Sequence, residues 1–485
     1  TVVVSADDPD MHSSQNEQDN RHYARAAGLP MLEPASSQEA YDFARRAFEL
    51  SEQFGTIVLL RLTTRICHSK GIVTPREPDT IEREYAFERD IPRFVMVPGN
   101  ARRRHAALEG RLTRLEELSE QTDLNTVVGS AQGAPLGIVA AGTTYHYVRE
   151  AAPHVPVFKV GMCWPMPLKA IAAFAAQVDD LLVVEELSDF MLTEICAAGT
   201  PARGKERQFR LGELNPDRVR CIIEDQPDYQ PPEAAADVPP PRPPVLCPGC
   251  GHRSVFHVLR KLGLLVTGDI GCYTLGALPP LSNLDTCVCM GASIGNALGI
   301  ERVSEPEEAR RVVAVIGDST FFHSGLTGVL DAVYNGSSGT LLILDNRTTA
   351  MTGGQAHPGT GQRLDGEPAP AISPAEACRG LGVRDIKEID AWDRARLEAG
   401  LQDSLSRNEY SVLVCRRPCL LLSRRRERAA YRVDPERCEN CGLCLRTGCP
   451  ALKQLEDHVE IDRIYCAGCG LCFEVCRFDA IEPVE

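Results

Sequence analysis

Eight of the twenty cysteines lie in one short segment, between Cys438 and Cys476. Their order is Cys-x2-Cys-x2-Cys-x4-Cys-Pro, followed by Cys-x2-Cys-x2-Cys-x3-Cys. Three thiolates at such intervals bind one face of an iron–sulfur cubane, and the fourth cysteine of each run ligates the other cluster. The spacing therefore predicts two [4Fe–4S] clusters. The first tail quartet is Cys438, Cys441, Cys444 and Cys476, and the second tail quartet is Cys466, Cys469, Cys472 and Cys449.

Zinc is the alternative to iron in this tail, because pairs of cysteines two residues apart also build zinc sites. A zinc site needs four ligands of its own and gains nothing from a doubled pattern of three cysteines plus one. A small domain that holds two clusters transfers single electrons, so its function depends on the domain to which it is connected.

A second set of polar residues follows two hydrophobic strands upstream of the tail. The predicted strand 312–316 ends in Gly317-Asp318-Ser319, and the predicted strand 340–344 ends in Asp345-Asn346. In a right-handed βαβ unit, Asp318 and Asn346 would lie at the carboxyl ends of neighbouring parallel strands. Mg²⁺ prefers a carboxylate, an amide oxygen and a backbone carbonyl, with diphosphate oxygens completing its octahedron. The sequence thus predicts a magnesium and diphosphate site, with an ordinary turn as the alternative.

This pattern is similar to the thiamine-diphosphate signature, in which Gly-Asp-Gly or Gly-Asp-Ser precedes an asparagine by a fixed interval. Here 26 residues separate Ser319 from Asn346. The resemblance implies that Asp318, Asn346 and the carbonyl of Thr348 bind Mg²⁺. The residues that it places near the diphosphate are Gly317, Ser319, Thr320, Ala350 and Met351.

Four further cysteines stand at the ends of predicted elements in the same region. They are Cys247, Cys250, Cys272 and Cys419, here called the internal quartet. They resemble cysteines that hold a cluster beside the cofactor in β-type subunits of 2-oxoacid:ferredoxin oxidoreductases, which implies a third cluster. On this resemblance Gly251, His252, Gly271 and Cys272 contact the cofactor. In the alternative interpretation, Cys247 and Cys250 are structural and the other two are small buried residues.

Several longer stretches resemble the large (alpha) subunit of indolepyruvate:ferredoxin oxidoreductases, and the similarity covers nearly the whole chain. The stretches are 7–21, 247–253, 268–280, 289–295, 317–325 and 344–361. The resemblance implies oxidative decarboxylation of indolepyruvate or a related aryl 2-oxoacid to an acyl-CoA. It also implies ferredoxin as the electron acceptor and a smaller β-type subunit in a hetero-oligomer. The family's N-terminal portion, with the glutamate that activates the cofactor, has no counterpart in this chain.

A long polar loop that follows the carboxyl end of the first predicted strand and three histidines outside it are further candidates for the site. In the loop, His12 and Arg21, with Ser13, Gln15 and Asn16, would contact the substrate carboxylate or cap the pocket. His252 is expected beside the cofactor, and His323 and His357 near its phosphates. Solvated loops are the alternative. The remaining cysteines look isolated and are interpreted as packing residues: Cys67, Cys163, Cys196, Cys221, Cys287, Cys289, Cys378 and Cys415.

Composition limits the class of protein further. The chain has 485 residues, of which 43% are hydrophobic and 25% charged, so it can bury several cores and wholesale disorder is excluded. A net charge of −15 disfavours nucleic acid as the main partner. No apolar run approaches the length of a membrane helix, which indicates a soluble, cytoplasmic protein. A reducing cytosol also favours metal ligation over disulfides for so many cysteines.

The elements that must position these residues form an α/β pattern. We expect several doubly wound parallel-sheet domains of the thiamine-diphosphate-binding type and a C-terminal two-cluster ferredoxin-like α+β domain. Thr1 to Val4 resemble a buried strand, so the chain is expected to begin inside a domain. The predicted domains are 1–75 (second half of a pyrimidine-binding-type domain), 76–120 (connector), 121–225 (transketolase C-terminal-like), 226–244 (proline-rich linker), 245–424 (thiamine-diphosphate binding) and 425–485 (ferredoxin-like).

Two other functions compete with the leading one. The same chemistry could act on phenylglyoxylate or on branched or small 2-oxoacids, which a substrate panel would distinguish. The chain could instead be a non-catalytic electron-transfer adaptor, and bound thiamine diphosphate would argue against that.

An arginine run could attract an acidic ferredoxin, or it could be a solvated linker. It consists of Arg424, Arg425, Arg426 and Arg428.

Overall fold

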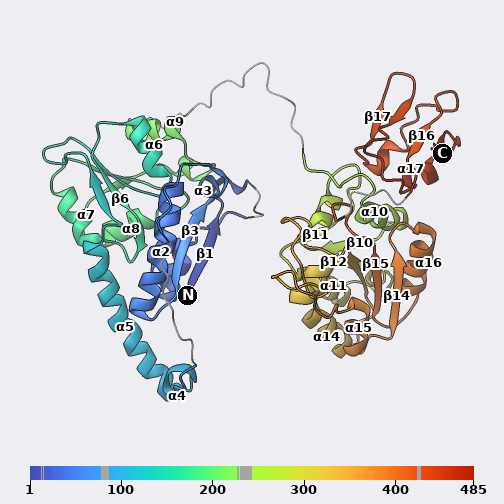
Figure 1. Ribbon diagram of the computed structural model, residues 1–485, viewed down its shortest axis with the longest axis horizontal. Coiled ribbons are helices and arrows are strands. Elements are labelled where there is room, and N and C mark those ends of the chain that lie inside the picture. Colours follow the sequence, from blue (N-terminus) through green and yellow to red (C-terminus); the bar gives the residue numbers. More distant parts are fainter. Residues whose placement is uncertain are drawn as a thin grey trace. The chain divides into compact units, whose positions relative to one another are not determined.

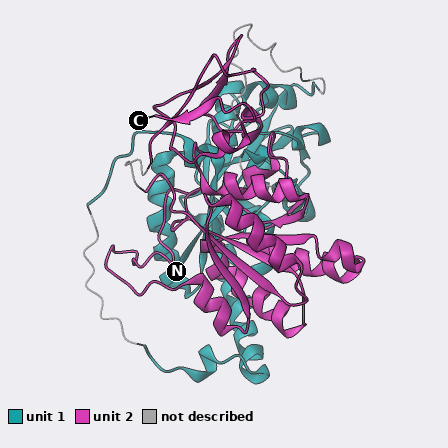
Figure 2. Cartoon of the chain, turned by 90° about the vertical axis from the view of Figure 1, so that its right-hand side faces the viewer, with its two compact units in different colours: residues 1–236 teal, residues 237–485 magenta. Residues whose placement is uncertain are grey.

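The structure, a computed structural model, describes residues 1–12, 14, 16–77, 87–226, 229, 243–422 and 428–484. The chain divides into two compact units, unit 1 (1–236) and unit 2 (237–485), shown in Figures 1 and 2. Most of the predicted linker 226–244 lies outside the described residues, as do Ser13, Gln15 and Arg424 to Arg426. The finer domain boundaries therefore stay predictions. No helix in the described part of the chain is long and apolar enough to cross a membrane.

Unit 1 contains two sheets of short, largely buried strands. The first has the order β1-β3-β2-β7, and only β7 is antiparallel to its neighbour. The second has the order β4-β6-β5-β8-β9, and only β4 is antiparallel. The strands are β1 (Val2–Asp7), β2 (Met31–Leu32), β3 (Val58–Thr63), β4 (Thr126–Val128), β5 (Gly137–Ala141), β6 (Val157–Val160), β7 (Met162–Trp164), β8 (Leu181–Val184) and β9 (Arg203–Gly204).

Helices connect these strands, as expected for parallel neighbours. They are α1 (Arg21–Ala27), α2 (Ser37–Phe54), α3 (Thr64–His68), α4 (Ile91–Phe94), α5 (Pro98–Gln121), α6 (Thr144–Ala151), α7 (Leu168–Ala175), α8 (Phe190–Ala197) and α9 (Pro216–Ile223).

The predicted connector 76–120 contains the longest helix of the chain among the described residues. Helix α5 begins at Pro98, a favoured first helical residue, and ends at Gln121. Its Leu115 is fully buried in the core formed with β3 and α2, and Leu118 packs against the same core. Only a connector was expected here, and this helix was not predicted because arginines obscured its buried face.

Unit 2 is built on one parallel sheet with the order β11-β10-β12-β13-β15-β14. All six residues of β12 and of β13 are buried, as expected when helices cover both faces of a parallel sheet. Val313 and Leu342 belong to one hydrophobic core, whereas Ala314 and Leu341 belong to the other. The strands are β10 (Leu265–Gly268), β11 (Thr286–Cys287), β12 (Val312–Gly317), β13 (Thr340–Asp345), β14 (Asp385–Asp390) and β15 (Ser411–Arg416).

The helices of this sheet domain flank both of its faces (Figure 1). They are α10 (Gly251–Leu262), α11 (Ala292–Val303), α12 (Pro306–Ala309), α13 (Asp318–Thr320), α14 (Leu326–Tyr334), α15 (Pro374–Gly380) and α16 (Arg394–Leu405). The π-helical turn Phe321–Gly325 joins α13 to α14.

The tail is a small domain of two antiparallel ribbons, β16–β19 and β17–β18. Its elements are β16 (Tyr431–Val433), β17 (Leu452–Gln454), β18 (Val459–Ile461), α17 (Leu471–Val475) and β19 (Ile481–Pro483). Its small core consists of aliphatic residues and the cysteines themselves. The predicted fold class, parallel α/β sheets followed by a ferredoxin-like tail, is confirmed.

Candidate functional site

The carboxyl ends of β12 and β13 place Asp318 and Asn346 at one edge of the unit 2 sheet. The two strands are parallel neighbours, with Gly317 opposite Leu344. Asp318 is 3% exposed and accepts a hydrogen bond from the Arg347 backbone N–H at 2.7 Å. The side-chain oxygen of Asn346 accepts from the Thr348 N–H at 3.1 Å. One buried carboxylate and one amide oxygen are thus held by the same short loop.

Arg347 is the turning point of this loop. Its φ of 64° lies in the left-handed region, which is unusual for a residue with a side chain. This conformation presents the N–H of Arg347 to Asp318. The donor set around the loop, a carboxylate, an amide oxygen and the backbone of buried Thr348, fits the requirements of Mg²⁺ with a diphosphate.

Two histidines contact these residues. His357 Nε2 lies 3.1 Å from an Asp318 oxygen but is not aligned for a hydrogen bond, and it has no other partner in the described structure. His252 Nε2 lies 3.4 Å from the Asn346 amide nitrogen. Burial lowers the pKa of His252 to about 4, although Asp318 acts in the opposite direction. His252 is therefore neutral at physiological pH.

A cavity beside Asn346 gathers the internal quartet. Its lining includes all four of these cysteines together with Gly251, His252, Asn346 and Ala350. The Cys419 N–H donates to the Asn346 carbonyl at 2.9 Å, so one hydrogen bond separates this cysteine from the proposed metal ligand. Burial raises the pKa of the Cys250 thiol to about 12. Four thiols around one cavity fit an iron–sulfur cluster, whose ferric charge stabilises thiolates that burial alone disfavours.

The remaining predicted cofactor residues lie around the same strand ends. Gly271 and Gly317 both pack against the ring of Tyr273, since a Cβ on them would lie 2.4 Å and 2.8 Å from that ring. Thr320 is buried and Ser319 half-buried, whereas Met351 is 49% exposed. His323 is exposed and bonds to the neighbouring Ser324 hydroxyl at 2.5 Å.

Tyr273 was not among the predicted site residues. It is 3% exposed, and its ring meets the His252 ring edge-on at a centroid distance of 6.0 Å. It stands next to Cys272 in the stretch 268–280, so the sequence contained a positional signal, but tyrosine itself indicated no particular role.

The tail holds two more cavities. One is lined by the first tail quartet and the other by the second tail quartet. Both quartets therefore combine cysteines from the two runs, as the spacing predicts. The Tyr431 N–H donates to Cys466 Sγ at 3.4 Å, the kind of contact that supports a cluster ligand. No three His, Cys, Asp or Glu side chains among the described residues converge closely enough for a single metal ion.

Buried cations fasten the tail to the sheet domain of unit 2. Arg253 of α10 donates to the Thr447 carbonyl at 2.9 Å. Arg394 of α16 donates to the Glu474 carboxylate at 2.5 Å and to the Cys469 carbonyl at 3.3 Å. Burial lowers the pKa of Arg253, while Cys449 and Cys250 act to raise it. The guanidinium thus lies close to thiols of both the second tail quartet and the internal quartet.

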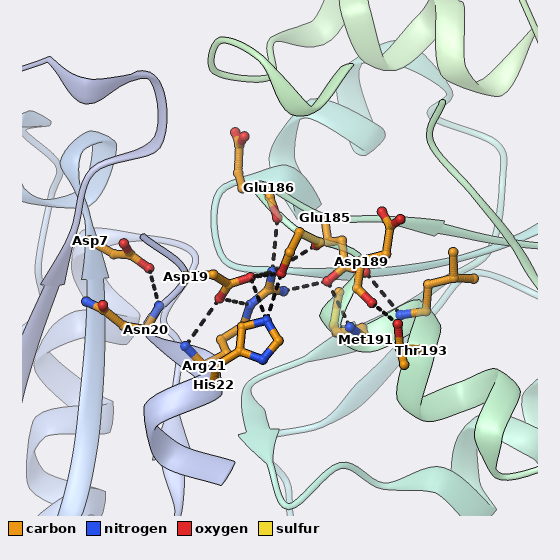
Figure 3. Close-up of polar contacts among 12 residues, drawn as sticks. Asp7, Asp19, Asn20, Arg21, His22, Glu185, Glu186, Asp189, Met191 and Thr193 are labelled. Carbon is orange, nitrogen blue, oxygen red and sulfur yellow. Dashed lines mark hydrogen bonds and ion pairs between the residues drawn. The ribbon is translucent and has the colours of Figure 1, made fainter. Parts of the chain in front are cut away.

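In unit 1, Arg21 is not available to a substrate. It is 1% exposed, and its three guanidinium nitrogens all donate within the protein (Figure 3). Nε and one Nη bind Asp19 at 2.8 Å and 2.7 Å, and the other Nη binds Glu185 at 2.6 Å. Although burial opposes its charge, Glu185 and Asp19 raise the pKa of Arg21. The expectation that Arg21 contacts the substrate carboxylate is therefore corrected, because its role is to join the two sheets of unit 1.

His12 lies elsewhere in unit 1. Its Nε2 is 3.2 Å from Glu213, a carboxylate that also pairs with Arg65. Asn16 is exposed. The eight isolated cysteines divide into three groups. Cys163, Cys378 and Cys415 are buried packing residues as predicted, and Cys221 and Cys287 are half-buried. Cys67, Cys196 and Cys289 are exposed, so the packing interpretation fails for these three.

Comparisons with known proteins agree with this arrangement. Residues 269–415 match the thiamine pyrophosphate enzyme, C-terminal TPP binding domain, and residues 459–482 match the 4Fe-4S binding domain. The sheet edge with Asp318 and Asn346 lies in the first region, and most of the second tail quartet lies in the second. A thiamine-diphosphate-binding domain and a [4Fe–4S]-binding domain are thus both present.

Named relatives cover almost the whole chain. The indolepyruvate oxidoreductase subunit IorA of Methanothermobacter marburgensis is 39% identical over 506 residues, which span 99% of this chain and 81% of the relative. The subunit IorA of Archaeoglobus fulgidus is 36% identical and covers 100% of this chain and 81% of its own length. Among solved structures, a 2-oxoglutarate:ferredoxin oxidoreductase from Magnetococcus marinus matches 37% of this chain and 65% of its own, with 17% identity and a TM-score of 0.32. The chain belongs to the indolepyruvate oxidoreductase subunit IorA family, within the thiamine-diphosphate-dependent 2-oxoacid:ferredoxin oxidoreductases.

Proposed function

We propose that the protein oxidatively decarboxylates indolepyruvate or a related aryl 2-oxoacid to the acyl-CoA and passes the electrons to ferredoxin. The family membership supports the reaction class. The name of the relatives supports the aryl substrate, and their designation as a subunit supports a hetero-oligomer with a smaller β-type chain. The observation that carries the proposal is the cavity in which the internal quartet adjoins Asn346.

Each group of residues has a defined task in this proposal. Asp318, Asn346 and the Thr348 carbonyl hold Mg²⁺, while Gly317, Ser319, Thr320, Ala350 and Met351 surround the diphosphate. When bound, thiamine diphosphate supplies an electron sink for the pair released as CO₂ leaves. Neutral His252, with Gly251, Gly271 and Cys272, would contact the bound cofactor. Its low pKa suits a hydrogen-bonding role better than that of a cation.

The three cysteine quartets would carry the electrons away one at a time. The cavity of the internal quartet is nearest to Asn346, and the second tail quartet adjoins it through the turn 247–250. The first tail quartet follows within the tail. This order connects the site of decarboxylation to the protein surface, where ferredoxin would bind.

Iron content tests the number of clusters directly. Oxygen-free protein, purified with its partner chain, should contain about twelve iron atoms per chain, against about eight if only the tail holds clusters. Cys419→Ser should lower the content by about four atoms. Cys415→Ser is the matched control, because Cys415 is buried on the preceding strand and does not line the cavity.

Substrate choice needs a separate assay. Reduction of a viologen dye by the purified complex, with CoA present, should be faster with indolepyruvate or phenylpyruvate than with pyruvate, 2-oxoglutarate or phenylglyoxylate. A complex that prefers pyruvate would contradict the aryl assignment and leave the cofactor assignment intact.

A further inference from the structure

One turn of chain separates the cavity of the internal quartet from that of the second tail quartet. Cys247 and Cys250 line the first cavity, whereas Gly249, which lies between them, lines the second. A Cβ on Gly249 would lie 2.5 Å from the Cβ of Ala467. The backbone of this turn therefore packs directly against the tail, without an intervening side chain.

Arg253 occupies the same boundary from the first turn of α10. It is 2% exposed and lines the cavity of the second tail quartet. One terminal nitrogen donates to the Thr447 carbonyl at 2.9 Å, and the other donates to the carbonyls of Leu246 and Cys247. Thr447 lines the tail cavity and Cys247 the internal one, so a single guanidinium joins the two walls.

The third nitrogen of Arg253 has no protein partner. Its Nε is buried and makes no hydrogen bond within the described structure. A buried N–H without a partner is costly, so an acceptor supplied by a group bound in the adjoining cavity would stabilise it. The four thiols of the same cavity provide the place for such a group, and cluster sulfur accepts hydrogen bonds.

The cavities of the two tail quartets differ in charge, while the internal cavity is lined by one arginine, Arg417. The cavity of the second tail quartet is lined by Arg253, whereas that of the first tail quartet is lined by Glu439 and by no Lys or Arg among the described residues. Reduction adds negative charge to a cluster. A nearby cation and a hydrogen bond to sulfur therefore favour the reduced state and raise the reduction potential.

We propose that Arg253 positions the second tail cluster by donating a hydrogen bond from Nε–H to it. The guanidinium raises the reduction potential of this cluster above that of the first tail cluster. This rests on the proposed function, because it requires a cluster in the second tail quartet. It adds a group that sets the order in which the clusters are reduced.

A redox titration followed by electron paramagnetic resonance tests the proposal in the complete oxygen-free complex. Arg253→Gln should lower the equilibrium constant for reduction of one cluster about tenfold, which corresponds to about 59 mV for a one-electron couple. Arg253→Lys, which keeps the charge, should shift it less. Arg260→Gln is the matched control, because Arg260 is exposed on the same helix and its side chain donates to the Pro280 carbonyl. Cys469→Ser identifies the signal of the second tail cluster.

The outcomes separate this inference from the function on which it depends. If Cys469→Ser protein shows every signal that the wild type shows, the cluster assignment itself is refuted. Arg253→Gln protein with full iron and unchanged potentials would overturn the role of Arg253. If Arg253→Gln loses iron, retention by Arg253→Lys supports the need for a cation. Loss from both variants overturns it, because the side chain would then serve only to join carbonyls.

Discussion

The buried position of Arg21 leads to a prediction that separates a structural role from a substrate-binding one. Arg21→Met would keep an unbranched apolar stem and remove the guanidinium with its charge. Asp19 and Glu185, which are 6% and 2% exposed, would then lose their cationic partner. Both carboxylates would keep two donors: Glu185 the N–H groups of Met191 and Leu192, and Asp19 the backbone N–H of residue 21 and the Ser188 hydroxyl.

The expected cost follows from this geometry. Removal of one partner from a buried ion pair destabilises a protein by about 3–5 kcal/mol. Arg25→Gln is the matched control, because Arg25 lies on the same helix and pairs with Glu194 of α8, but it is 52% exposed. An exposed pair contributes less than about 1 kcal/mol. Arg21→Met should therefore lower the unfolding free energy of unit 1 several-fold more than Arg25→Gln.

Hydrogen exchange in increasing urea, measured by mass spectrometry on peptides from β8 and α8, reports the stability of unit 1 separately from that of unit 2. Steady-state rates, normalised to bound thiamine diphosphate, should give the same KM for the 2-oxoacid in Arg21→Met as in the wild type, because the Arg21 side chain does not reach solvent. The reasoning would be refuted by an Arg21→Met protein as stable as Arg25→Gln whose KM is strongly raised.

Two further predictions concern other buried groups. Burial raises the pKa of Glu186 from an ordinary 4.5 to about 7, so Glu186 is protonated in the folded protein but ionised in the unfolded chain over this range. The unfolding free energy of unit 1 should therefore fall by about 3 kcal/mol as pH rises from 4.5 to 7. Urea unfolding at the two pH values should show that Glu186→Gln abolishes this loss. The same pH dependence in Glu186→Gln and wild type would contradict the prediction. Gly249→Ala should speed hydrogen exchange in the tail, because φ is +74° and the new Cβ would clash with Ala467. Gly263→Ala shares the positive φ but meets only the flexible end of Arg311, so equal effects of the two substitutions would exclude the tail contact as the cause.

The sequence was sufficient for features that depend on local pattern. Runs of buried aliphatic residues located β12 and β13 to within a residue. The interval between Ser319 and Asn346 anticipated that two strand ends would meet, because adjacent parallel strands impose that geometry. The alternation of the cysteine runs likewise anticipated which thiols share each tail cavity.

Features that depend on distant pairing were not accessible. Nothing near Arg21 in the sequence indicates its partner Glu185, which is 164 residues away, so a buried ion pair looked like a free substrate ligand. Arg253 and Tyr273 both lie next to predicted site residues, but their roles depend on contacts that the sequence does not show. Arg253 binds the tail, and Tyr273 packs against two glycines. Helix α5 was missed because the apolar residues Leu115 and Leu118 are few among many charges.

Retention of thiamine diphosphate tests the central assignment most directly. Asp318 and Asp345 are both buried carboxylates at neighbouring strand ends, but Asp345 pairs with Arg416 at 2.8 Å whereas Asp318 faces the loop of Asn346. Oxygen-free protein with Asp318→Asn or Asp345→Asn should be equilibrated with Mg²⁺, desalted, denatured and analysed for the cofactor. We predict about one molecule per active site in the wild type and in Asp345→Asn, and a loss of at least roughly tenfold in Asp318→Asn. Full retention by Asp318→Asn would contradict the account.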